Sequence, residues 1–201
     1  DVCSSDLPSY PSSPSYPSYL SYTASMTRNR IAVLVGTVAI VAAGVFVRAQ
    51  RPPLSPHETH AFTVDGVKII FEYGRPSKRG REIWGALVPW GRWWMPGADK
   101  ATIITTDAPI ILGDTVLVPA GDHTLYTQPG PEVFKLIVNN SVGQFHTQYF
   151  PEQDLGQVPM TLRKLAEPVE MLTFGAEATP GGGGLLKLLW ADREYSVKIS
   201  R

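Results

Sequence analysis

Residues 61–73 read AFTVDGVKIIFEY, the pattern of two short strands joined by a tight turn. Asp65-Gly66 at the centre readily adopts the positive φ angles that a two-residue hairpin turn requires. From residue 67 to residue 73 apolar side chains occupy alternate positions, with Lys68 and Glu72 between them. Successive side chains of a strand point to opposite faces, so this alternation predicts an antiparallel hairpin with one buried face and one wet face.

Similar strand patterns recur through the rest of the chain. A second hairpin is predicted from residues 110–112 and 115–118, which flank Gly113-Asp114. Further strands are predicted over residues 101–106, 123–127, 133–139, 160–165, 169–178, 185–190 and 194–199. No segment keeps a helical period beyond about two turns. Many short strands separated by turns predict an all-β fold, a single antiparallel β-sandwich of the jelly-roll or immunoglobulin-like kind.

The composition excludes several classes of protein. The chain has 201 residues with 18 basic and 18 acidic side chains, so no net charge favours nucleic acid as a partner. Its single cysteine, Cys3, excludes an intrachain disulfide and a four-thiolate zinc site. We therefore predict no nucleic-acid partner and a fold whose stability comes from packing.

The first 25 residues contain a Ser/Pro/Tyr-rich stretch, in which Pro-Ser-Tyr recurs. Such a segment has too little aliphatic surface to offset the entropy of the chain, so it is predicted to be disordered. Because the sequence begins at Asp1, we expect translation to start at Met26. Residues 1–25 would then be an assembly artefact; the alternative is a genuine disordered tail.

Residues 26–49 have the three-part form of a secretory signal. Arg28 and Arg30 precede an uncharged apolar run at residues 31–47, and Ala49 follows at a position that a signal peptidase reads. The run also reaches the lower end of a membrane-spanning length, so an uncleaved inner-membrane anchor is the alternative. Both interpretations predict an exported domain, periplasmic or extracellular. Residues 50–58 are predicted as a linker and residues 59–201 as the β domain.

The segment from residue 74 to residue 101 is the most unusual in composition. It contains four of the 5 tryptophans and a cluster of basic residues among Gly and Pro. Buried Trp anchors are common in β cores, and this is the simplest interpretation of Trp84. Trp93 and Trp94 are adjacent, so on a strand only one of them faces the core, and an exposed indole beside Arg suits a sugar ring or another planar ligand. The candidate ligand-binding residues are Arg75, Arg81, Trp84, Trp90, Trp93, Trp94 and Asp99.

Support for catalysis is weak in the sequence. There is no nucleophile elbow, phosphate loop or Cys/His grouping, so neither a cofactor nor a metal site is predicted. Asp99 and His123 are the candidate acid and base if the domain is a hydrolase. That interpretation requires the two groups to meet in one cleft.

Several motifs carry a family resemblance. They include GREIWGALVPWG at residues 80–91, WMPGADKAT at residues 94–102 and VPAGDHTLYTQPG at residues 118–130. On these motifs the chain resembles the bacterial domain-of-unknown-function family 2911, over roughly residues 58–200. Met95 and Asp99 stand where that family usually has Arg and Asn. The resemblance implies an exported β-rich domain and no established activity.

Taken together, the residues favour a non-catalytic domain that binds a glycan or a neighbouring envelope protein through its Trp/Arg-rich loop. The alternatives are a hydrolase acting on an envelope polymer and a purely structural accessory domain. The sequence leaves the oligomeric state open.

Overall fold

The computed structural model describes residues 54–201. The predictions for the tail, for the apolar run and for residues 50–53 lie outside the described residues. Within residues 54–201, no helix has the length and apolar character needed to cross a membrane.

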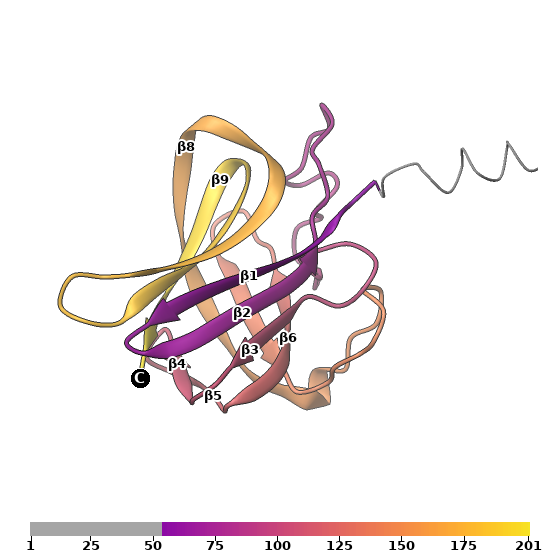
Figure 1. Cartoon of the computed structure of the whole chain (residues 1–201). Helices are drawn as coiled ribbons and strands as arrows, with labels where there is room; N and C mark the ends of the chain where they lie inside the picture. The colour runs from indigo at the N-terminus through magenta and orange to yellow at the C-terminus, as the bar shows by residue number, and fades with distance from the viewer. Residues whose placement is uncertain (1–53) are drawn as a thin grey trace, which may run out of the picture. The chain divides into compact units, whose positions relative to one another are not determined.

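Nine antiparallel strands form one continuous sheet, in the order β1-β2-β3-β6-β7-β8-β9-β4-β5 (Figure 1). The prediction of an antiparallel all-β fold is confirmed. A 3-10 turn at Pro151–Gln153 precedes β8. The strands are β1 (His57–Val64), β2 (Val67–Gly74), β3 (Ile103–Thr106), β4 (Ile110–Leu112), β5 (Val116–Val118), β6 (Gly121–Gln128), β7 (Phe134–Asn139), β8 (Asp154–Ala178) and β9 (Gly184–Ser200).

The β1–β2 hairpin forms as its sequence predicts. Asp65 and Gly66 have φ angles of 48° and 78°, and Val64 pairs with Val67 across the turn. The apolar residues at alternate positions of β2 are buried, its lysine and glutamate are exposed, and Ile70 between them is half-buried. Strand β1 starts at His57, so the last two residues of the predicted linker belong to the sheet. The predicted β4–β5 hairpin also forms.

The C-terminal strands are longer than predicted. Residues 160–165 and 169–178, expected as two strands, lie in the single strand β8, and residues 185–190 and 194–199 lie in β9. Pro168 does not end β8, because the pairing with β9 shifts register between Lys164 and Val169 and again before Thr173. Ala191, opposite Val169, has a φ of 51°. Figure 1 shows β8 arching around the bend of β9 at this place.

The bend carries the second half of β8 over the apolar side of the first strands. Phe174 of β8 stacks on Phe71 at 5.3 Å between ring centroids and meets the edge of Tyr73 at 5.1 Å. One core cluster therefore draws on strands from both ends of the sheet. The division into two separate sheets, which a β-sandwich would have, is not confirmed, because β8 pairs with both β7 and β9.

An ion pair across β8 and β9 makes the stability depend on pH. Arg163 and Glu194 are cross-strand partners, and their side chains lie 2.5 Å apart. The hydrogen bond from Arg163 is the main cause that lowers the pKa of Glu194. A carboxylate with a lowered pKa contributes stability above its unfolded pKa of about 4.3, and this stability is lost as the pH falls through the folded pKa.

We expect Glu194→Gln to lower the stability at pH 7 and to flatten the loss of stability on acidification below roughly pH 4.3. Urea unfolding of the full chain between about pH 3 and pH 7 measures this, because both limits bracket that pKa. The matched control is Asp114→Asn, which removes an exposed ion pair to Lys198. Asparagine, like aspartate, tolerates the φ of 61° at position 114. If stability fell as steeply with acidification in Glu194→Gln as in the original chain, the ion pair would not be the cause of the pH dependence.

Candidate functional site

The connection between β2 and β3, residues 75–102, contains no strand of the sheet but is attached to it at several points. Isolated bridges join Ser77 to Met171, Trp94 to Thr127 and Lys100 to Phe145. Ile83, Trp84 and Val88 belong to the core cluster. The Trp/Arg-rich segment is therefore fixed in place by β6, β8 and the loop after β7.

The four tryptophans of this segment have four different environments. Trp84 is buried and meets Phe134, Trp190 and Tyr195 edge to face. Trp90 lies under the guanidinium of Arg193, which is 5.3 Å from its ring centroid. Trp93 is 39% exposed, whereas Trp94 stacks on Trp190 at 6.0 Å with an interplanar angle of 12°. The two adjacent indoles point to different surroundings, in keeping with alternation along an extended segment.

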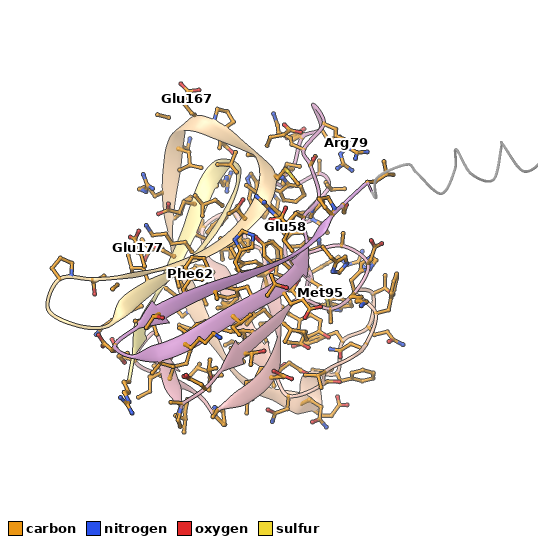
Figure 2. All side chains as sticks on the ribbon, viewed as in Figure 1. Glu58, Phe62, Arg79, Met95, Glu167 and Glu177 are labelled. Atoms are coloured by element: carbon orange, nitrogen blue, oxygen red, sulfur yellow. The ribbon has the colours of Figure 1, made fainter. Side chains whose placement is uncertain are left out.

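Trp94 and Trp190 line an open cleft of about 370 Å³, which we call the Trp94 cleft. Its apolar part also includes Leu87, Gly97 and Ala98. Its charged and polar part consists mainly of Arg79, Arg81, Asp99 and His146. Trp190 is buried and the arginines are exposed, so the cleft is aromatic at its base and basic at its rim. Figure 2 shows Arg79 on the loop that projects beside β8 and β9.

Hydrogen bonds fix the polar groups around the cleft. Arg81 donates to the carbonyls of Lys78 and Ser77, at 3.0 and 2.7 Å. The carbonyl of Asp99 accepts from the backbone N–H of His146 at 3.1 Å, and His146 Nδ1 lies 2.8 Å from the same oxygen. When His146 is neutral, that contact places its proton on Nδ1 and leaves Nε2 as the acceptor. Asp99 itself has a φ of 66°.

Arg75, a candidate from the sequence, lies outside the lining of the Trp94 cleft. Its guanidinium donates to Glu58 at 2.7 Å, to the carbonyl of Leu172 at 3.1 Å and to Thr173 Oγ1 at 2.8 Å. The hydrogen bond with His60, followed by that from Arg75, lowers the pKa of Glu58. Arg75 thus connects the start of β1 to β8 by hydrogen bonds, so its role is structural.

His123, the candidate base, does not line the cleft with Asp99. It is 5% exposed on β6, and its ring nitrogens lie 3.1 Å from Asn140 Oδ1 and 2.9 Å from the carbonyl of Pro119. Trp84, Trp90 and Trp93 are also absent from the lining. Of the seven predicted ligand-binding residues, the structure therefore brings Arg81, Trp94 and Asp99 together.

The seven predicted residues did not include Arg79, Trp190 and His146, which also line the cleft. Arg79 was part of the basic cluster, but no pattern distinguishes it from its neighbours. Trp190 and His146 lie far along the chain from residues 74–101 and reach the cleft only through the sheet. Among the described residues, no three His, Cys, Asp or Glu side chains are grouped to bind a metal ion.

The strands and the cleft together define a class: an antiparallel all-β domain whose single sheet supports an open cleft with an aromatic base and a basic rim. No curated protein and no solved structure matches the chain. The family model described as "Protein of unknown function (DUF2911)" matches residues 55–199, and the chain belongs to that family. The resemblance seen in the sequence is thereby confirmed.

Proposed function

We propose that this chain is an exported, non-catalytic module that binds a glycan of the cell envelope in the Trp94 cleft. The predicted signal or anchor at residues 26–49 supports the compartment. In this proposal the sheet folds over its core as a β-sandwich of the jelly-roll or immunoglobulin-like kind. Such a scaffold would hold the binding loop rigid. The observation that carries the proposal is the indole of Trp94 in an open cleft, backed by Trp190 and flanked by Arg79 and Arg81.

The chemistry of the cleft suits a sugar ring. The C–H face of a pyranose packs on an indole, and hydroxyls accept hydrogen bonds from guanidinium groups at the rim. Trp94 is supported from behind by Trp190, so little ordering entropy is lost on binding. Volumes of roughly 300–1,000 Å³ are typical of small-molecule sites.

The geometry favours binding over hydrolysis. Asp99 is the single carboxylate among the described residues that line the cleft, whereas glycoside hydrolysis ordinarily uses a pair. The alternative with Asp99 and His123 as acid and base lacks the convergence that it needs, because His123 is buried elsewhere on β6.

We expect Trp94→Ala to weaken glycan binding by about tenfold or more, because a buried aromatic anchor commonly dominates an interface. A glycan array of the full chain would select the ligand, and isothermal titration calorimetry would measure its affinity. Trp93→Ala is the matched control: it removes the neighbouring indole, which does not line the cleft. Trp94→Phe keeps an aromatic ring at this position. Comparing it with Trp94→Ala distinguishes a loss of binding through lost stacking from one through lost folding.

Two results would overturn the proposal. One is a full chain that binds no glycan on the array. The other is a bound glycan whose affinity falls as much in Trp93→Ala as in Trp94→Ala. Recovery of an envelope protein that competes for the Trp94 cleft, with no glycan bound, would replace the glycan with a protein partner.

A further inference from the structure

A second cleft, of about 310 Å³, lies beside Trp84 and Arg193, and we call it the Trp84 cleft. Three buried side-chain nitrogen or oxygen atoms in residues 54–201 have no hydrogen-bond partner: Trp84 Nε1, Arg193 Nε and Gln144 Oε1. The first two belong to residues that line this one cleft. Buried donors are nearly always paired, because an unpaired one loses its hydration without compensation, so two in one place require an explanation.

Neighbouring contacts hold both donors in position. Arg193 Cζ lies 5.7 Å from the ring centroid of Trp84 and 5.3 Å from that of Trp90. Arg193 Nη1 donates to the hydroxyl of Tyr195 at 3.0 Å. The nearest carboxylate, Asp192, lies 3.9 Å from Nε, which is beyond hydrogen-bonding distance. Neither donor therefore has a side-chain acceptor within reach.

The backbone around the Trp84 cleft is strained. Ala191 lines the cleft and has a φ of 51°, in the left-handed region that a residue with a side chain rarely adopts. It lies at the register shift between β8 and β9. Backbone outliers and bulges of this kind cluster at binding sites, where the surrounding structure compensates their cost.

We infer that the Trp84 cleft binds a carboxylate, which accepts hydrogen bonds from Trp84 Nε1 and Arg193 Nε. Both free groups are donors, so the ligand must supply acceptors. The charged side chains of the lining are Lys78 and Arg193 against Glu82 and Asp192, a balanced set. A balanced set disfavours a phosphate dianion and suits a singly charged carboxylate. Because both nitrogens are buried, entry requires a small displacement of the partly exposed Arg193 side chain.

The indole N–H signals of the ¹⁵N-labelled full chain test the inference, with Trp84→Phe identifying the signal of Trp84. Acetate and glycine are titrated separately against sodium chloride of equal ionic strength. We expect a saturable shift of the Trp84 signal with both carboxylates and none with chloride. Glycine binding more tightly than acetate would show that Glu82 or Asp192 also receives the ammonium group.

Variants supply the remaining arms of the experiment. Trp84→Phe keeps the ring and removes the donor, so acetate affinity, followed by the Arg193 Nε–H signal, should fall by about tenfold. Trp94 does not line the Trp84 cleft, so Trp94→Phe should leave acetate affinity unchanged, which keeps this inference independent of the proposed function. Two results would overturn the inference of a carboxylate site. One is a Trp84 signal that does not respond to carboxylates, and the other is a Trp84 signal that shows a long-lived bound water unaffected by them.

Discussion

Replacing Trp190 with alanine should lower the free energy of unfolding by about 3–5 kcal/mol. Trp190 is 1% exposed, lies parallel to Trp94 and meets the edge of Trp84. Its Nε1 donates to the carbonyl of Glu170 at 3.2 Å, inside the bend of β8. Alanine would leave a cavity between the sheet and the β2–β3 connection. It would also remove the indole hydrogen bond to Glu170, whose carbonyl keeps the backbone N–H of Lys78 as a donor.

Urea unfolding at pH 7, followed by circular dichroism, measures this effect. Leu117→Ala is the control, because Leu117 is 58% exposed on β5, and its effect should stay within about 0.5 kcal/mol. A Trp190→Ala chain that loses no more stability than Leu117→Ala would contradict the packing described for the core.

Gly74→Ala is expected to destabilise the domain by about 1–3 kcal/mol and to abolish ligand binding in the Trp94 cleft. A Cβ at Gly74 would lie 2.3 Å from the carbonyl oxygen of Ala98. The clash is with backbone, so a change of rotamer cannot relieve it, and the segment 97–99 must move. That segment lines the Trp94 cleft and carries Asp99. The substitution therefore links the end of β2 directly to the site.

Gly175→Ala provides the matched control. Gly175 is also in a strand, a Cβ there meets nothing within 4 Å, and its φ lies outside the left-handed region. We expect its stability to change by less than about 0.5 kcal/mol and its ligand affinity to stay the same. Equal loss of binding in the two glycine variants would show that the effect of Gly74→Ala does not arise at the cleft.

Local patterns predicted the fold well where the deciding interactions are local. Asp65-Gly66 produced the expected turn, and alternation identified the buried face of β2. The prediction failed around Pro168: a break between two strands was expected at residues 166–168, but β8 runs through it. Proline cannot donate a ladder hydrogen bond, but the register shift before Val169 lets β8 continue past it. Such a shift depends on the partner strand and leaves no mark in the surrounding sequence.

For the site, the sequence located the segment but not the roles of its residues. Clustered Trp and Arg indicated residues 74–101, and Trp94, Arg81 and Asp99 do line the cleft. Arg75 was a candidate of equal merit, yet its partners Leu172 and Thr173 make it part of the fold. Composition cannot distinguish an arginine that meets a carbonyl nearly a hundred residues away from one that meets solvent.

By itself, the sequence determined the all-β class and the first hairpin, because these depend on neighbouring residues and their period of two. Contiguous motifs determined the family, and local composition determined the position of the Trp/Arg-rich segment. Only the tertiary structure decided that β8 and β9 bend the sheet over one core, and that Trp190 and His146 join Trp94 in one cleft. The physical reason is distance along the chain. Pairing and packing between remote segments depend on the register and bend of the sheet, and a local pattern carries no record of either.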